Sequence, residues 1–366
     1  MDDLLKSLNT TERAVHQAHE LIKLCAKGGF NLTKFTSNDR EVLSSLSAEK
    51  RANPNLDLSL DKLPNERTLG VSWNLESDEL GFKVVEMKKP DTMRGVLSTI
   101  CTIFDPLNFV APVMLVAKKI MQELWRKKYS WDEQLEGDIL QRWQNWKKSL
   151  HFLSDVTVPR CYFSKLEHEG STLEVHNFSD ASEAGYGSVS YLRIAYPNGS
   201  VECSFVAGKS RNAPLKTVTI PRLELQAAVL VVRMDNAIRM ELDIRRVAFW
   251  TDSMIVLNYI TNETRRFQTY VSNRIAEIHE ITATDQWRHC PGILNPADDA
   301  SRGVEVPNFL QDNRWLRGPA FLLRPEEEWP VTKLQDLPET SFEIKREIYT
   351  TEVNPMKNLN NLISDT

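Results

Sequence analysis

The sequence has few of the features that mark a membrane, secreted or strongly basic protein. Its 366 residues include no apolar run close to the roughly 20 residues that a membrane helix needs, and the N-terminus lacks a signal-peptide pattern. Its five cysteines form no CxxC motif and no cluster with histidine, which argues against a zinc site or a disulfide framework. Basic residues number 45 and acidic residues 50, so no overall positive field attracts a polyanion. We therefore expect a cytoplasmic or nuclear protein that contacts no membrane and meets any nucleic acid in a local groove.

Glycine is also scarce, at 14 residues, and proline is not enriched, at 17, while hydrophobic residues make up 41% of the chain and charged residues 26%. This composition excludes wholesale disorder and leaves enough apolar side chains to form a core. The length exceeds that of one ordinary domain of roughly 100–200 residues, so we expect two or three domains.

The N-terminal half is predicted to combine a β-hairpin with several helices. An amphipathic helix is expected over Thr11–Lys27, because apolar and small residues recur there at helical spacing until two glycines end the pattern. Residues 44–66 are polar, contain prolines and predict a linker, whereas 69–73 and 80–85 predict a β-hairpin. Further helices are predicted at 94–103, 113–127 and 135–150.

The C-terminal half alternates between strands and helices, which predicts an α/β fold after an α+β N-terminal part. The first three strands form a meander, and a long helix follows it. The expected strands lie at 173–178, 186–194, 201–206, 247–250 and 286–289, and the expected helices at 221–242, 254–260 and 268–282. Beyond Gly303 the chain holds two tryptophans and a polar end, for which we expect low order.

Four acidic residues stand where such a fold would expose them. Asp180 lies at the first strand, Glu224 in the first turn of the long helix, Asp252 at the end of the fourth strand and Asp298 at the start of a last short helix. Neighbouring strands lie about 4.8 Å apart, so a sheet with a helix packed over it can gather these distant residues. Four carboxylates can hold two Mg²⁺ ions about 3.5–4 Å apart, which clamp the attacking and leaving oxygens of a phosphodiester. Each acid taken singly is also explained as a strand-end or helix-cap residue, but together they favour a catalytic site.

Short motifs surround these acids: FSDASEAGYG at 178–187, IPRLELQAA at 220–228, WTDS at 250–253, and NPAD with SRG within 295–303. These motifs resemble the ribonuclease H domain of Pao/BEL-type LTR retrotransposon polyproteins. The order of the acids agrees, since transposases and integrases of related fold end their triad with Glu, whereas here Glu is second and Asp closes the set. Related exonucleases carry Asp-x-Glu in the first strand, which Asp180 lacks. The resemblance implies a ribonuclease H-like mixed sheet with flanking helices.

Upstream motifs extend the resemblance to residues 1 to about 330. LGVSW at 69–73, RGVLS at 94–98, FDPL at 104–107 and APV at 111–113 resemble the region between polymerase and ribonuclease H in these elements, with Asn108 where the family usually has Gly. The initial MDD resembles the end of the reverse transcriptase YMDD motif, but its partner Asp from an earlier strand is missing, so the polymerase part is incomplete. The implied domains are a palm-end and thumb remnant at 1–90, a helical connector at 91–160, a ribonuclease H-like domain at 165–305 and a partly disordered extension at 306–366.

The resemblance implies metal-dependent hydrolysis of the RNA strand of RNA/DNA hybrids. Asp180, Glu224, Asp252 and Asp298 would bind Mg²⁺ or Mn²⁺, two ions in all, and the metal would activate the attacking water. Asp299 is a competing candidate for the last ligand position. Helical direction lets only one of the two adjacent aspartates face the metals, and the family pattern selects Asp298.

Hybrid binding is expected to rest on cations, backbone shape and 2′-hydroxyls rather than on base sequence. Arg222, Lys209, Arg211 and Lys216 would contact phosphates, although each is also explained as a residue of a solvated surface. His289 would relay protons or assist product release, and a half-buried structural histidine explains it equally well. Other parts of the retroelement polyprotein are a second expected class of partner.

Two other functions stay open. The chain can be a non-catalytic remnant that binds nucleic acid or a partner, or that is inert, although it keeps all four acids. The name peptidase A17, which is attached to the Pao family, suggests an aspartic peptidase instead. That chemistry requires two aspartates that share one proton, from Asp-Thr-Gly or Asp-Ser-Gly loops, and the sequence contains neither motif.

Overall fold

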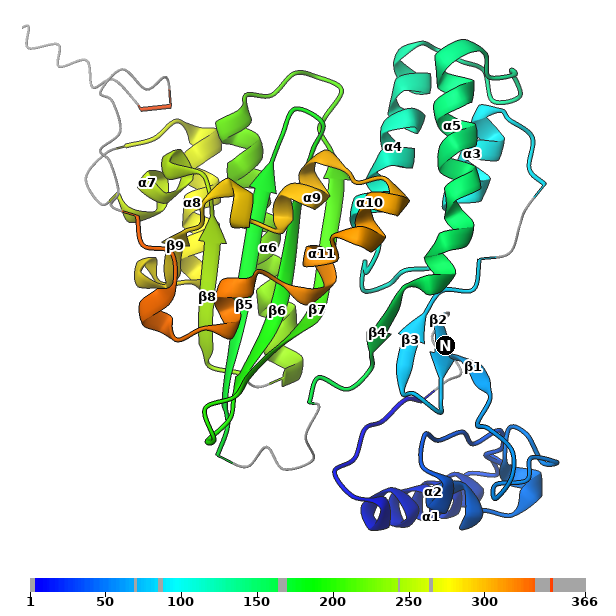
Figure 1. Cartoon of the computed structure of the whole chain (residues 1–366). Coiled ribbons are helices and arrows are strands. Elements are labelled where there is room, and N and C mark those ends of the chain that lie inside the picture. Colours follow the sequence, from blue (N-terminus) through cyan, green and yellow to red (C-terminus); the bar gives the residue numbers. More distant parts are fainter. Residues whose placement is uncertain are drawn as a thin grey trace, which may run out of the picture.

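A computed structural model gives the structure of the protein over residues 4–68, 71–84, 88–163, 170–242, 244–262, 266–332 and 343–344. Two β-sheets and a bundle of helices organise these residues (Figure 1). The MDD motif at 1–3, part of the strand predicted at 69–73 and most of the polar C-terminal end lie outside them. None of the helices in these ranges has the length and apolar character needed to span a lipid bilayer.

The N-terminal part combines two helices with a small antiparallel sheet. Its elements are α1 (Thr11–Lys27), α2 (Arg40–Ser44), the 3₁₀ turn η1 (Ala48–Lys50), β1 (Asn65–Thr68), β2 (Val71–Asn74), β3 (Glu79–Gly81) and β4 (Thr157–Pro159). The predicted first helix is confirmed, and so is the hairpin, in which β2 pairs with β3 and Trp73 lies opposite Leu80. Its second strand, predicted at 80–85, ends at Gly81, so the prediction is wrong for 82–84, and residue 85 lies outside the described residues. The linker predicted at 44–66 is wrong at its end, because residue 65 begins β1 and Leu63 is buried with Leu43 and Trp73 in a small core.

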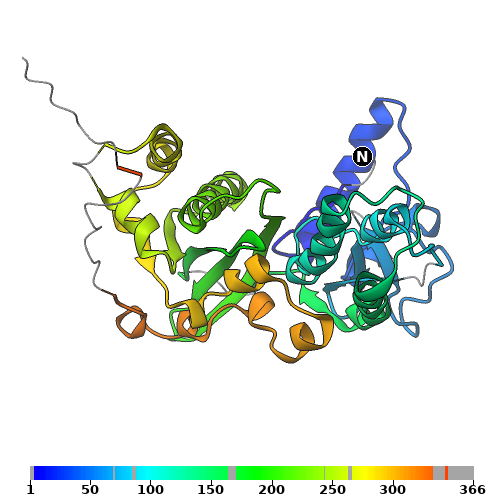
Figure 2. The same ribbon diagram turned by 90° about the horizontal axis from the view of Figure 1, so that it is seen from above.

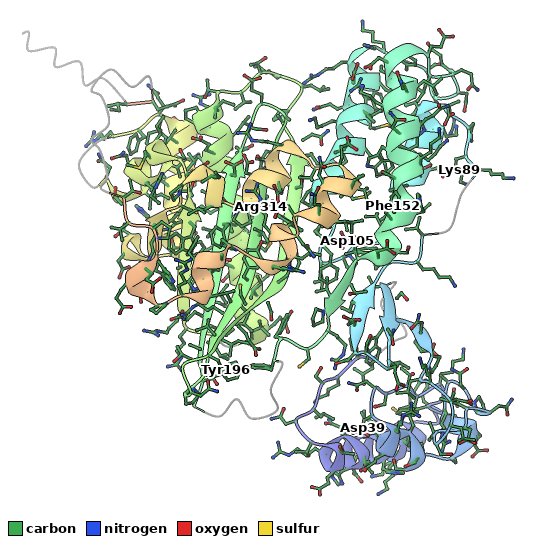
Figure 3. The ribbon with its side chains drawn as sticks, in the orientation of Figure 1. Asp39, Lys89, Asp105, Phe152, Tyr196 and Arg314 are labelled. Carbon is green, nitrogen blue, oxygen red and sulfur yellow. The ribbon has the colours of Figure 1, made fainter. Side chains whose placement is uncertain are left out.

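A helical bundle follows at the positions that the apolar periodicity predicts. It consists of α3 (Met93–Ile100), α4 (Ala111–Arg126), α5 (Gly137–Ser149) and the turn η2 (Leu150–Asp155). The Asp105 carboxylate accepts hydrogen bonds from the amides of Phe109 and Val110, both 2.9 Å, and so fixes the turn that leads into α4 (Figure 3). Trp143 and Trp146 are buried, with their rings stacked at 5.3 Å, so they pack the interior of the bundle.

The large sheet is mixed, as the sequence predicts. Its strands are β5 (Thr172–Ala181), β6 (Gly185–Ala195), β7 (Val201–Asn212), β8 (Arg246–Thr251) and β9 (Trp287–His289), in the spatial order β7-β6-β5-β8-β9. β6 runs antiparallel to β5 and β7, whereas β8 runs parallel to β5 and to β9. The carboxyl ends of β5 and β8 therefore lie side by side at one end of the sheet.

Helices cover both faces of this sheet (Figure 2). On one face, α6 (Ile220–Leu242), α7 (Met254–Thr261) and α8 (Thr269–Ile281) bury Val175, Leu192 and Phe249. The turns and short helices near the carboxyl end of the chain are η3 (Thr284–Gln286), η4 (Gly292–Leu294), α9 (Ala297–Arg302), α10 (Val306–Gln311), α11 (Arg314–Arg317), η5 (Ala320–Leu323) and η6 (Glu326–Glu328). The second face packs against α9 to α11 and the segment after them.

The low order expected for the polar C-terminal end falls mostly outside the described residues, whereas residues 306–329 before it form short helices and turns. Trp315 and Trp329 are buried there, 0% and 6% exposed. The aromatic side chains of Phe178 and Trp250 lie on the second face of the sheet. The segment 306–329 packs over this face and so removes the apolar surface from contact with water. The same hydrophobic core also includes side chains of α3, α4 and α5, so it crosses the domain boundaries proposed near 160 and 305. The division into four domains stays a prediction.

Candidate active site

The mixed sheet brings three of the predicted acids to one end. Asp180 is the ninth residue of β5, and Asp252 directly follows β8, whose last residue, Thr251, lies opposite Ser179. Because β5 and β8 are parallel neighbours, the two aspartates lie at the same edge. Glu224 comes from the start of α6, which packs on β5 and β6.

These three carboxylates act on one another electrostatically. Asp180 is 4% exposed, and burial together with the Asp252 carboxylate raises its pKa from 3.8 to about 7. Burial also raises the pKa of Asp252, with the Glu224 carboxylate adding to the shift, and it raises the pKa of Glu224, with Asp180 adding to that shift. Such mutual shifts require the groups to be close, because charge interactions fall off with distance.

Hydroxyl groups hold two of the acids, and no cation of the described chain pairs with the three. Ser301 donates to Asp180 Oδ2, and Ser253 donates to Glu224 Oε2. Asp252 Oδ1 is buried without a hydrogen-bond partner. In the parts of the chain that the structure describes, no Lys or Arg forms an ion pair with Asp180, Glu224 or Asp252. A cluster of one buried and two half-buried acids without an ion-pair partner is unfavourable unless protons or cations neutralise it.

The acid cluster offers the type of donor atom that a hard divalent cation prefers, without a preformed ligand shell in the described part of the chain. Carboxylate oxygens are the ligands that Mg²⁺ and Mn²⁺ prefer, and the unpartnered Asp252 Oδ1 offers one. Gly292 keeps space open beside the other oxygen of the same carboxylate, since a Cβ at that position would lie 3.0 Å from Asp252 Oδ2. Among the described residues, no three His, Cys, Asp or Glu side chains already surround one point as a ligand shell.

Asp298, the predicted fourth ligand, lies at the border of the cluster. Its charge contributes to the raised pKa values of Asp180 and Asp252. Its carboxylate also pairs with Arg302 one turn along α9 and lies 3.5 Å from Arg314. Asn295, in the loop before α9, ties this region to β5 by donating to the Ser179 carbonyl at 3.0 Å and is fully buried.

His289 lies at the end of β9, beside the main chain of Asp252. Its ring is half-buried, and burial lowers the pKa of His289. A hydrogen bond with the Asp252 backbone raises this pKa, but burial has the larger effect. The Nδ1 atom of His289 lies 2.8 Å from the Thr332 hydroxyl. The neutral form of the His289 ring is therefore favoured at pH 7. This ring lies beside the backbone of Asp252, one of the three acids.

The predicted phosphate contacts separate into two groups. Lys209, Arg211 and Lys216 are exposed on β7 and the loop that follows it. Arg222 is instead held by an acid of the chain itself, because its Nε donates to Glu343 at 2.6 Å and its guanidinium lies 4.7 Å from the Tyr270 ring.

Arg211 also borders a cavity of about 230 Å³ between β6, β7, α6 and α8. Its basic lining residues are Arg211, Arg233 and Arg274, of which Arg233 pairs with Glu277. The sequence analysis missed Arg233 and Arg274. Arg233 lies in α6 and Arg274 in α8, so no short sequence motif contains both. Only the packing of α6 against α8 brings the two side chains to one cavity.

Comparison with known proteins adds a family match. Residues 92–253 match the family model described as the Pao retrotransposon-like RNaseH-like domain, whereas no curated protein matches the sequence. This match covers the predicted connector helices and the sheet from β5 to β8, and the reverse transcriptase and connector assignments stay predictions.

Several solved structures are similar to part of the chain. One is an N-terminal RNase H domain from Mycobacterium tuberculosis, solved as a fusion with maltose-binding protein, with 12% identity, coverage of 36% of this chain and 94% of that chain, and a TM-score of 0.25. RNase H1 from Halobacterium salinarum has 13% identity, coverage of 35% and 93%, and a TM-score of 0.23. LC11-RNase H1 in complex with an RNA/DNA hybrid has 12% identity, coverage of 35% and 93%, and a TM-score of 0.24. The family match and the mixed sheet show that residues 92–253 are similar to the Pao retrotransposon-like RNaseH-like domain, and they support an RNase H-like region in this part of the chain.

Proposed function

We propose that the protein is a divalent-metal-dependent nuclease that hydrolyses the RNA strand of RNA/DNA hybrids. The observation that supports this proposal best is the group of acids beside the carboxyl ends of β5 and β8, of which Asp180 is buried and Glu224 and Asp252 are half-buried. No Lys or Arg among the described residues forms an ion pair with them. A purely structural acid is normally paired with a cation when it is buried. A group of three such acids is instead typical of a site that receives its cation from solution.

Asp180, Glu224 and Asp252 would hold the metal, with Asp298 as a further ligand. Bound Mg²⁺ or Mn²⁺ supplies charge neutralisation at the phosphate and makes the attacking water more acidic. Ser301 and Ser253 fix the orientation of the Asp180 and Glu224 carboxylates through their hydroxyl groups. The raised pKa of Asp180 means that it gives up a proton when the cation binds near neutral pH.

The remaining residues of the site would handle protons and the nucleic-acid backbone. The neutral ring of His289 can accept a proton beside Asp252. Arg211 and Arg274, which border the cavity, would contact a backbone phosphate, while Arg233 on the same wall is paired with Glu277. A protein that meets phosphates and 2′-hydroxyls in this way recognises a hybrid by its shape rather than by its sequence.

A cleavage assay tests the proposal. The purified chain is incubated with an RNA-labelled RNA/DNA hybrid and, in parallel, with single-stranded RNA, double-stranded RNA and double-stranded DNA, each with Mg²⁺, Mn²⁺ or a chelator. We expect cleavage of the hybrid only when metal is present. Asp252→Asn should abolish cleavage, whereas Asp285→Asn, an exposed site with the same change of charge, should not. If wild-type protein and Asp252→Asn give the same product pattern, the assignment is wrong.

A non-catalytic nucleic-acid-binding role is the second candidate. It is favoured by one observation, that Asp298 is already paired with Arg302 and lies close to Arg314. In that case the chain should bind the hybrid equally well with metal or chelator and should show no heat of Mn²⁺ binding in calorimetry.

A further inference from the structure

Arg314 of α11 links α11 to α9 and to the turn at Ile293, beside the acid cluster (Figure 3). The sequence alone predicts no role for the segment that contains it. The Arg314 Nε lies 3.0 and 3.1 Å from the two carboxylate oxygens of Asp299, and its Nη2 bonds one of the same oxygens. Its Nη1 donates to the Ile293 carbonyl at 3.1 Å, in the loop before α9. Its Nη2 also lies 3.5 Å from Asp298. Asp299 is largely buried in this pair, with 12% of its side chain exposed.

The pairing decides which of two adjacent acids faces the cluster. Consecutive residues of an α-helix point about 100° apart, so Asp298 and Asp299 cannot both face Asp180. Ser301 lies three residues after Asp298, on the same side of α9, and donates to Asp180. The side of α9 that carries Asp298 is thus the side toward the cluster, while Arg314 holds Asp299 away from it.

Arg314 is itself held in place by its neighbour in α11. Trp315 is fully buried, and its backbone carbonyl accepts a hydrogen bond from the Tyr191 hydroxyl at 2.7 Å. Its indole ring fills the space that Gly208 of β7 leaves, since a Cβ on that glycine would lie 2.4 Å from the ring. The guanidinium therefore starts from a backbone that is anchored to the sheet.

We propose that Arg314 is a positioning residue for the metal site: by fixing Asp299 and the loop at Ile293, it keeps α9 turned so that Asp298 faces the acid cluster. This inference rests on the proposed nuclease function. It extends that function to a residue outside the predicted ribonuclease H-like domain and outside the matched region 92–253.

The test measures Mn²⁺ binding by calorimetry, hybrid cleavage and thermal unfolding in matched variants. Arg314→Met removes the guanidinium, and Arg317→Met, an exposed position of the same helix, is the control for the substitution itself. Arg314→Met also leaves the Asp299 charge buried without a partner. The double variant Asp299→Asn with Arg314→Met removes that charge, so it separates the loss of positioning from a loss of folding.

We expect Arg314→Met and the double variant to weaken Mn²⁺ binding about 10-fold or more, as is usual when a partner of a metal ligand is removed. The double variant should unfold close to the wild-type temperature, its kcat should fall, and its KM for the hybrid should stay unchanged. Arg314→Lys should restore part of the Mn²⁺ affinity, because it keeps a cation beside Asp299 without the bidentate geometry.

Wild-type Mn²⁺ affinity in the folded double variant would overturn the positioning role while leaving the nuclease proposal intact. Absence of metal-dependent cleavage by the wild type would defeat the nuclease proposal instead. Calorimetry would still decide whether Arg314 supports the metal site.

Discussion

Replacing Asp180 with asparagine is expected to stabilise the protein at neutral and alkaline pH while abolishing hybrid cleavage. Burial and the neighbouring Asp252 carboxylate raise the pKa of Asp180 from 3.8 to about 7. The unfolded chain, in contrast, ionises this side chain near pH 4. Above pH 7 the folded protein therefore holds a buried negative charge that the unfolded protein exposes to water.

The pKa shift gives the size and the sign of the effect. Between about pH 4 and pH 7 the folded state keeps a proton on Asp180 that the unfolded state has released, so the free energy of unfolding falls as the pH rises. A shift of about three pH units, at about 1.4 kcal/mol each, lowers the free energy of unfolding by about 4 kcal/mol above pH 7. Because Asp252 shares the titration, we expect asparagine to recover roughly 2 kcal/mol at pH 8 and little near pH 4.

Urea and thermal unfolding of wild type and Asp180→Asn, in a chelator at pH 5 and pH 8, measure this effect. The stability gain of the variant should be larger at pH 8, where roughly 2 kcal/mol corresponds to about 4–8 °C for a domain of 150–250 residues. Asp285→Asn, at an exposed position, should show no such pH dependence. Equal gains at both pH values, or a variant that is less stable at pH 8, would refute the argument from buried charge.

Three further predictions concern the metal, the core and the cationic cavity. Mn²⁺ at 100 times its Kd should stabilise the wild type by about 2.7 kcal/mol in a thermal-shift titration, and Asp252→Asn should lose that shift. Trp315→Ala should lower the free energy of unfolding in urea by about 3–5 kcal/mol, because the ring is fully buried; a loss below about 1 kcal/mol would contradict its place in the core. Arg211→Ala should weaken hybrid binding and reduce the slope of log K against log salt by about 1, and an unchanged slope in a binding titration would show that the residue meets no phosphate.

The sequence predicts best the elements whose signals are local. The helix α1 ends at Lys27, where Gly28 and Gly29 follow, and α6 runs over Ile220–Leu242, one residue from the expected start. Both helices have apolar residues at helical spacing, a signal that needs no knowledge of the rest of the chain. The three strands of the meander are predictable because they are β-rich runs, and a Pro-Asn-Gly turn at 197–199 separates the second from the third. The fourth strand is predictable from its short apolar run at 247–250.

Elements that depend on a distant partner were missed or shortened. β7 continues to Asn212, six residues beyond its predicted end, because its small and polar last residues pair with β6 over their whole length. The strands β1 and β4 are short, and β4 joins the small sheet by pairing with β3 about 78 positions earlier in the chain. The segment 306–329 consists of single helical turns without periodicity, and its order comes from the aromatic face it covers.

The same distinction explains which residues of the candidate site the sequence revealed. Asp180 and Asp252 could be found because strand ends, small neighbours and a family resemblance mark their positions, and the parallel pairing of β5 with β8 then brings them together. Arg314 has no such mark, because an arginine on a short helix resembles any exposed cation. The proposed role of Arg314 depends on Asp299, which is adjacent to the predicted ligand Asp298. From the sequence alone, Asp299 could be considered only as an alternative candidate for that ligand position. Sequence motifs thus identify the acidic residues of the site. The residue that we propose orients one of them lies outside these motifs, and only the packing of α11 against α9 brings it to the site.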